Sequence, residues 1–183
     1  PTLLDFAGVL DPSTGTVPLE MASLPGKGKG KDKKPEPYRF HGRSFLNVVD
    51  QSQPEGWDRI NASHTFHEIQ MYYPMRVVRE RQYKLIWNIA YPLPYPFASD
   101  LWAAATWQAQ WKLGKDAPYG KRTVGQYIQR PKFELYDLQK DPHERHNLAE
   151  DPEFQSVLYE MQKKLKRFQQ DAKDPWVLKW EYE

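Results

Sequence analysis

The residues best suited to chemistry lie in one short stretch of the sequence, residues 67–76. His67 and Glu68 are adjacent, and Arg76 follows Pro74. The planar guanidinium of an arginine can hold a carboxylate or a sulfate through two parallel hydrogen bonds, and a histidine can donate another. His67, Glu68 and Arg76 are therefore candidates for binding an anionic group. A structural role fits equally, with Glu68 paired to Arg76 and His67 packed as a polar side chain.

Two histidine pairs have a spacing that a metal site on a helix would use. They are His64 with His67, and His143 with His146. The first pair enters an expected strand and the second lies in an expected turn, and no third ligand is evident near either pair. Because zinc sites in proteins use three or four protein ligands, we expect no metal site here.

Aromatic and lysine-rich segments offer two further binding surfaces. Trp102, Trp107 and Trp111 could stack on sugar rings, although aromatic residues on a helix more often belong to a core. Glycine and lysine alternate in residues 26–34, GKGKGKDKK. This segment could be a basic finger for a sulfated or phosphorylated polymer, but its composition favours a solvated, flexible linker.

Composition excludes several classes of function. The chain has 183 residues, a net charge of +2 and no cysteine. The missing cysteines exclude disulfides, zinc–thiolate sites and a cysteine nucleophile. The low net charge argues against a nucleic-acid partner. No apolar run approaches the roughly 20 residues that a membrane span needs, so no membrane partner is expected.

The elements that would position these residues form a mixed pattern. Residues 66–78 read as a strand bulged at Pro74, residues 83–90 as a second strand, and residues 133–138 as a third. The short stretch 79–82 favours an antiparallel hairpin between the first two. Residues 101–113 are expected to form a helix with Ser99 as its N-cap.

The end of the chain carries its strongest helical pattern. Asp141, followed by Pro142 and Glu144, resembles a capping box that opens one or two helical turns. A long helix is expected from Asp151-Pro152, ending before Asp174-Pro175, with one apolar stripe. The stripe contains Phe154, Val157, Leu158, Met161, Leu165 and Phe168. The pattern predicts an α+β fold, in which a small antiparallel sheet of about four strands packs against a long C-terminal amphipathic helix.

Five segments, in the same order, resemble the carboxy-terminal part of sulfatases of the heparan N-sulfatase type. The clearest is FELYDL at residues 133–138, continued by DPHE at 141–144 and NLA at 147–149. The others are PTLLD at 1–5, GRSFL at 42–46, HEIQMYYPMR at 67–76 and YKLIWN at 83–88. The resemblance implies that residues 1–10 are a remnant of a catalytic-domain helix, 11–56 a linker and 57–183 the C-terminal subdomain. We expect the chain to begin within a longer product.

What the resemblance implies for catalysis lies outside this chain. Sulfatases use a formylglycine, made from the first residue of a C/S-x-P-x-R motif, and a calcium ion, both in a large amino-terminal domain. Neither Ser23-Leu24-Pro25 nor Ser52-Gln53-Pro54 continues into that motif. We therefore expect no catalytic residue and no metal ligand in this chain.

The resemblance predicts an accessory subdomain of an exported sulfatase, whether periplasmic, secreted or lysosomal. Its expected partners are the catalytic domain, in the same or a separate chain, and a sulfated saccharide. His67, Glu68 and Arg76 would border the substrate pocket. Two alternatives stay open: a stand-alone module that binds anionic polysaccharide through Arg76 and the lysine-rich segment, and a protein-interaction module.

Overall fold

The computed structural model describes residues 1–11, 14–17, 38–40, 42–67 and 71–182. The chain divides into two compact units, Pro1–Glu55 and Gly56–Glu183, and each is described by itself. The lysine-rich residues 26–34 and Glu68 lie outside the described residues. No helix in the described part of the chain is long and apolar enough to cross a membrane.

The first unit contains only short elements. They are α1 (Thr2–Phe6), β1 (Thr16–Val17), β2 (Tyr38–Arg39) and the 3-10 helix η1 (Leu46–Val48). Strand β1 pairs antiparallel with β2. Helix α1 buries none of its residues, and Leu3 and Phe6 are 83% and 77% exposed. A helix of this length is unstable in isolation, so α1 depends on packing for its stability.

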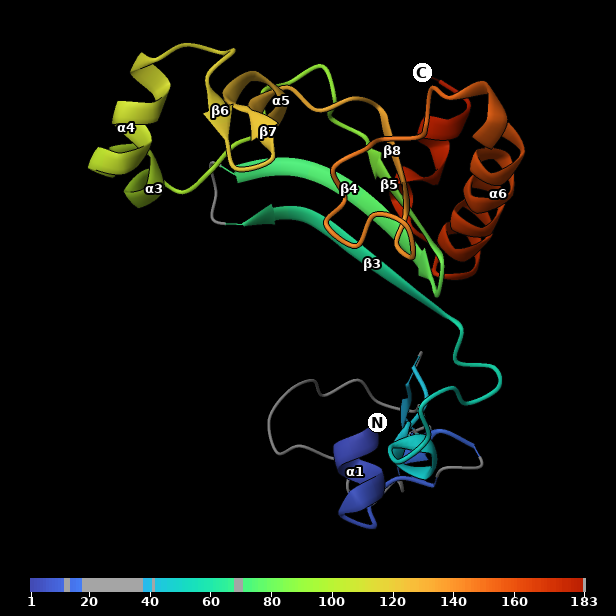
Figure 1. Ribbon diagram of the computed structural model, residues 1–183. Coiled ribbons are helices and arrows are strands. Elements are labelled where there is room, and N and C mark those ends of the chain that lie inside the picture. Colours follow the sequence, from blue (N-terminus) through green and yellow to red (C-terminus); the bar gives the residue numbers. More distant parts are fainter. Residues whose placement is uncertain (12–13, 18–37, 41, 68–70, 183) are drawn as a thin grey trace. The chain divides into compact units, whose positions relative to one another are not determined.

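The second unit is built on a four-stranded antiparallel sheet (Figure 1). Its strands are β3 (Arg59–His67), β4 (Met71–Glu80), β5 (Tyr83–Asn88) and β8 (Phe133–Asp137). Their order across the sheet follows the sequence, β3-β4-β5-β8. The predicted sheet and the predicted hairpin between the second and third of these strands are confirmed.

One expected strand is in fact two. The expectation of a single strand over residues 66–78 was wrong, because β3 ends at His67 and β4 begins at Met71. His64 pairs with Met75 and Phe66 pairs with Tyr72, so two steps along β3 match three along β4. The extra residue is a β-bulge opposite Thr65, at Tyr73-Pro74. The bulge expected at Pro74 is therefore present.

One face of the sheet is covered by α6 (Gln155–Asp171), as Figure 1 shows. Leu158, Met161 and Leu165 of α6 are buried in one core with sheet residues. Those sheet residues include Val78, Leu85, Trp87 and Leu135. Burying each large apolar side chain contributes about 1.5–3 kcal/mol, so this contact holds the helix to the sheet. The long C-terminal amphipathic helix is confirmed.

The ends of α6 differ slightly from expectation. Asp151 caps the 3-10 helix η2 (Pro152–Phe154) through the Glu153 amide at 3.0 Å, and α6 follows directly. Phe168, expected on the buried stripe, is half-buried, and Gln169 is fully buried beside it. The chain then forms the 3-10 helix η3 (Pro175–Trp180). Trp180 packs against Trp87 with a ring distance of 4.1 Å, so the tail belongs to the core.

The remaining elements gather around a second, smaller core. They are α3 (Ser99–Ala103), α4 (Ala105–Lys112), β6 (Pro118–Tyr119), β7 (Arg122–Thr123) and α5 (Val124–Ile128). Trp107 is buried at the centre of this core with Ala117 and Val124, and half-buried aromatic residues surround it. This aromatic core explains most of the tryptophans in the middle of the chain.

Two expectations about the helix over residues 101–113 were wrong. The helix expected over residues 101–113 is broken at Ala104, whose backbone is extended, and Ser99 is a helical residue instead of the N-cap. The break lets Trp102 and Trp107 both pack against Phe97, at ring distances of 5.6 Å and 4.8 Å. The packing of these rings, which a local pattern does not contain, therefore overrides the local capping signal.

The segment after Asp141 forms turns, where one or two helical turns were expected. The Asp141 carboxylate accepts from the amides of Arg145 and His146, at 2.6 Å and 2.8 Å, which are too far along the chain for a capping box. Glu144 has a positive φ of 53°, and its carboxylate binds Lys84 at 2.7 Å. A long-range ion pair thus replaces the local cap.

Candidate functional site

Arg76, the candidate anion-binding arginine, is already engaged within the fold. It lies on β4 and is 4% exposed. Its Nε and Nη2 donate to the two carboxylate oxygens of Asp174, at 2.5 Å and 3.0 Å. Its Nη1 donates to the carbonyl oxygens of His64 and Met75, at 2.9 Å and 2.8 Å. This bidentate pair joins β4 to a residue 98 positions away and ties it to β3 beside the bulge.

Asp174 is the centre of a second set of contacts. Gln169 Nε2 and the Trp176 amide also donate to its carboxylate, at 3.0 Å and 3.1 Å. The side-chain oxygen Oε1 of Gln169 in turn accepts from the Trp180 indole N–H at 2.7 Å. Burial raises the pKa of Asp174, but the hydrogen bonds from Arg76, Gln169 and Trp176 outweigh it and lower that pKa below its ordinary value of 3.8.

Acid is therefore expected to destabilise this network. A carboxylate whose folded pKa is lowered stabilises the fold above its unfolded pKa, and that contribution is lost as the pH falls through the folded pKa. We expect the urea midpoint to fall steeply below about pH 4. The Asp174→Asn variant should lose part of this pH dependence, whereas Asp100→Asn, at an exposed residue of α3, should keep it. An unchanged acid profile for Asp174→Asn would contradict the assignment.

Of the other two candidate residues, the structure describes only His67. His67 is the last residue of β3 and is exposed. Glu68 lies outside the described residues, so its expected pairing with Arg76 is not tested. His64, three residues earlier on β3, forms a hydrogen bond from its Nδ1 to the Tyr73 carbonyl oxygen at 3.1 Å. The structure thus separates Arg76, held inside, from His67 at the hairpin end.

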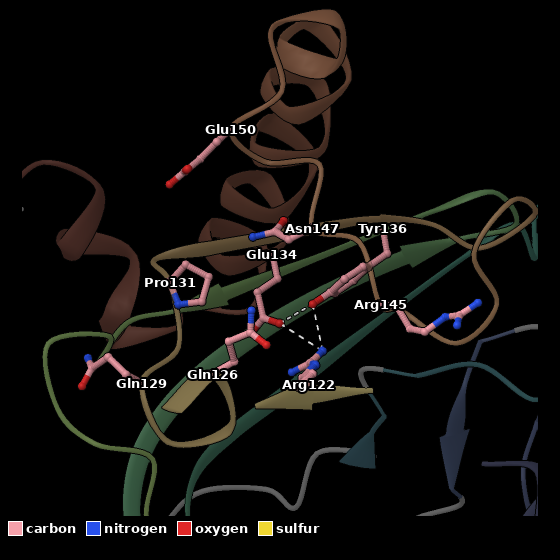
Figure 2. A pocket seen from close by; sticks show the side chains of 9 residues that line it. All are labelled: Arg122, Gln126, Gln129, Pro131, Glu134, Tyr136, Arg145, Asn147 and Glu150. Atoms are coloured by element: carbon pink, nitrogen blue, oxygen red, sulfur yellow. Dashed lines mark hydrogen bonds and ion pairs between the residues drawn. The ribbon is translucent and has the colours of Figure 1, made fainter. Parts of the chain in front are cut away.

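A pocket of about 280 Å³ lies on the sheet face opposite α6, around β8 and α5 (Figure 2). Its inner wall is formed by Glu134 and Tyr136 of β8 and by Arg122 of β7. The three side chains point toward one another, as Figure 2 shows. Residues at the rim include Gln126, Gln129, Arg145, Asn147 and Glu150. The pocket is polar and contains both signs of charge.

The wall of this pocket is a hydrogen-bonded network. Glu134 is 2% exposed. Its carboxylate accepts from the side-chain NH₂ of Asn88 at 2.8 Å and from the Tyr136 hydroxyl. Arg122 Nη2 lies 3.6 Å from the Glu134 carboxylate and donates to the Tyr136 hydroxyl at 3.0 Å. Burial, together with the Glu134 charge, raises the pKa of Tyr136 well above its usual range. Tyr136 therefore stays protonated and keeps donating to Glu134.

Metal-binding residues do not assemble in the described part of the chain. No three His, Asp or Glu side chains there lie close enough together to hold an ion. His143 and His146 are both exposed in the turn after Asp141. Among the described residues, neither histidine pair therefore has a third ligand nearby for a zinc ion.

Residues 121–171 match the family described as N-sulphoglucosamine sulphohydrolase, C-terminal. The human N-sulphoglucosamine sulphohydrolase is 34% identical over 139 residues, which cover 74% of this chain and 27% of that protein. The chain belongs to the sulfatase family. It corresponds to the family's carboxy-terminal region, as the ELYDL and HEIQMYYPMR segments indicated.

A second relative also matches this chain, and two solved structures share its fold. The ulvan-active sulfatase of Formosa agariphila is 29% identical over 131 residues, covering 66% of this chain and 22% of that protein. BT1596, a 2-O GAG sulfatase, shares the fold with a TM-score of 0.50 at 20% identity. BT4656, solved with its substrate D-glucosamine-2-N,6-O-disulfate, has a TM-score of 0.51 at 18% identity. Each of these two structures matches 96% of this chain, which covers 24% of theirs.

This sulfatase chain therefore spans about a quarter of the length of the relatives that it matches. The formylglycine and calcium expected in a sulfatase do not fit the residues present. The sequence has no cysteine, and no C/S-x-P-x-R motif follows either Ser23 or Ser52. No step of sulfate hydrolysis can be assigned to a residue of this chain.

The sequence of β8 contains a signal for the Figure 2 pocket. In Phe133-Glu134-Leu135-Tyr136, period-two alternation places Glu134 and Tyr136 on one face of the strand and the apolar pair on the other. A carboxylate and a phenol on the same face, in a strand buried on both faces, indicate a polar network. Its partner Arg122 could not be recognised, because β7 is only two residues long.

Proposed function

We propose that this chain is the carboxy-terminal subdomain of an exported sulfatase that acts on sulfated, glycosaminoglycan-type sugars. It packs against the catalytic domain and helps to form the substrate pocket. It contributes no catalytic group, because the aldehyde nucleophile and the calcium ion belong to the catalytic domain. The names of the relatives, an N-sulphoglucosamine sulphohydrolase and a GAG sulfatase, support this class of substrate.

The observation that carries the packing proposal is the state of β3. This strand has nine residues, lies at the edge of the sheet and buries none of them. In the described part of the chain it pairs with β4 alone. Ile60 and Phe66 on it are 60% and 66% exposed. A long, exposed edge strand with apolar side chains invites aggregation, so folded proteins cover such strands.

The occupant that fits this edge is the catalytic domain. The chain spans about a quarter of the length of its relatives, and the remaining three quarters of a sulfatase would include that domain. The hairpin end with His67 and Glu68 would then face the substrate pocket. Arg76, through its hold on the bulge and on Asp174, would fix the direction of the hairpin without touching the sugar.

The stand-alone polysaccharide module is less well supported. It relied on Arg76, whose guanidinium is taken up by Asp174 and backbone carbonyls. It also relied on residues 26–34, which lie outside the described residues. The packing proposal needs neither.

Ile60→Asp is expected to weaken binding of this chain to a sulfatase catalytic domain made as a separate polypeptide. Covering β3 would bury the new carboxylate without a partner, which costs at least about 1.4 kcal/mol and so reduces affinity tenfold or more. Titration calorimetry measures the loss, and sulfatase activity of the mixture should fall with it.

The matched control is Leu178→Asp. Leu178 is 59% exposed and lies on η3, away from β3 in the sequence and on another element. It should leave the affinity unchanged. Equal loss in both variants would contradict docking through β3. Sulfate release by this chain alone would overturn the non-catalytic assignment.

A further inference from the structure

The pocket of Figure 2 adjoins a second, larger one. The second pocket has a volume of about 660 Å³ and includes Trp111 and Lys115 in its wall. Both pockets are lined by Gln126 and Gln129, which lie in and directly after α5. The two pockets therefore adjoin at α5, and we call them together the α5 groove. Its lining contains an aromatic ring, side-chain amides and cationic side chains.

We propose that this groove along α5 binds a sulfated oligosaccharide. The choice of a sulfated sugar rests on the proposed function, whereas the place and the residues come from the groove itself. Trp111 would take the apolar face of one sugar ring, and Arg122 with Arg145 would hold a sulfate or carboxylate at the other end. Lys115 would hold a second anionic group beside Trp111.

Arg122 is prepared for an anion. Its Nη2 is held by the Tyr136 hydroxyl at 3.0 Å and the Glu144 carbonyl at 3.2 Å, and it lies 3.6 Å from Glu134. Its Nε and Nη1 have no partner among the described residues. A guanidinium fixed through one nitrogen loses little conformational entropy when its free edge binds a sulfate. Arg145, 41% exposed, lies at the rim of the same pocket and is joined to Asp141 only at 3.8 Å.

Trp111 and Lys115 supply the other end of the groove. Trp111 is half-buried and held against Trp102 and Trp107 at ring distances of 5.7 Å and 6.3 Å. A fixed aromatic ring at a pocket wall is suited to the C–H face of a sugar. Lys115 is exposed, and in the described part of the chain its ammonium has no ion-pair partner.

The two glutamines keep free hydrogen-bonding atoms toward a ligand. The side-chain oxygen of Gln126 accepts from the Thr123 backbone amide at 2.9 Å, so the side-chain NH₂ group of Gln126 remains available. Gln129 donates its NH₂ to the Tyr91 carbonyl at 2.7 Å, so its oxygen remains available. Asp116 and Glu150 also line the groove and can accept from sugar hydroxyls. The arrangement of cationic and anionic side chains would therefore favour oligosaccharides whose sulfate groups lie opposite the cations.

The test is titration calorimetry of the full chain with a heparin-derived tetrasaccharide and with the same tetrasaccharide after desulfation. The double variant Lys115→Ala, Arg145→Ala should raise the Kd by about tenfold or more, since two charge-assisted contacts are lost. Neither substitution touches a core residue. The desulfated tetrasaccharide should bind at least about tenfold more weakly than the sulfated one for the same reason.

The matched control is Lys163→Ala, Arg167→Ala on α6. Arg167, like Arg145, is exposed and is paired with an aspartate four positions away. This double variant should leave the Kd within about twofold, as expected for exposed charges outside the site. A third variant replaces the lysines of residues 26–34 with glutamine.

The outcomes separate this inference from the proposed function. If the third variant abolishes binding while the groove variant does not, or if the α6 control loses as much as the groove variant, the groove proposal is overturned. Equal binding of the desulfated sugar overturns it as well. None of these results bears on docking to the catalytic domain, which is measured with Ile60→Asp on β3.

Discussion

Asp174→Ala is expected to destabilise the chain by about 3–5 kcal/mol, because it leaves the buried Arg76 guanidinium without its counter-charge. The Asp174 side chain is only 10% exposed, and that of Arg76 is 5% exposed. The same substitution removes the cap of η3, where Asp174 accepts from the Trp176 amide at 3.1 Å. Urea unfolding followed by tryptophan fluorescence would measure the loss.

Two controls isolate the buried pair. Asp171→Ala removes an exposed carboxylate, 60% accessible and paired with Arg167, and should change stability by less than about 1 kcal/mol. Arg76→Met together with Asp174→Leu removes both charges and should cost far less than Asp174→Ala alone, since no buried charge remains unpaired. If the double variant is as unstable as Asp174→Ala, the loss comes from packing or capping instead.

The buried pair has a consequence for function. Arg76 joins the Asp174 tail to the carbonyl of His64, next to the β-bulge that bends the β3–β4 hairpin. Loosening the pair should therefore loosen the hairpin end where His67 lies. If the hairpin end borders the substrate pocket, as proposed above, this change should raise KM more than it lowers kcat in a complete sulfatase, because the hairpin would bind the sugar and not the reacting sulfur.

The sheet and the long helix could be predicted because their signals are local and repeat along the chain. Tyr83, Leu85 and Trp87 recur at period two in β5, and Leu158, Met161 and Leu165 recur at helical spacing in α6. Strand β3 was missed because its alternation is weak. Ile60, Ala62 and Phe66 share one face of Arg59–His67, but His64 interrupts that face and the described fold buries none of its residues.

The candidate site was harder to predict than the fold. Arg76 was selected for its chemistry, but its partner lies 98 residues away in a segment that the pattern marked only as a helix end. The Figure 2 pocket depends on Arg122, Glu134 and Tyr136, which converge from two elements whose pairing in space no local pattern contains. Long-range polar contacts follow from tertiary structure, so residue spacing alone does not reveal them.

The packing of α6 leads to the second large effect. Leu165→Ala is expected to cost about 2–5 kcal/mol, because it opens a cavity in the core between the helix and the sheet. Leu165 is fully buried, and its core includes Val78 and Leu85 of the neighbouring strands. Chemical denaturation at neutral pH would measure the loss in the free energy of unfolding.

Tyr159→Ala on the same helix is the matched control. Tyr159 is 59% exposed, so its removal should change the free energy of unfolding by less than about 0.5 kcal/mol. A similar cost for the two variants would mean that α6 is not held to the sheet through Leu165. A large difference would show that the helix is part of the sheet's own core. Association with a catalytic domain would then have to use another surface, such as the exposed edge of β3.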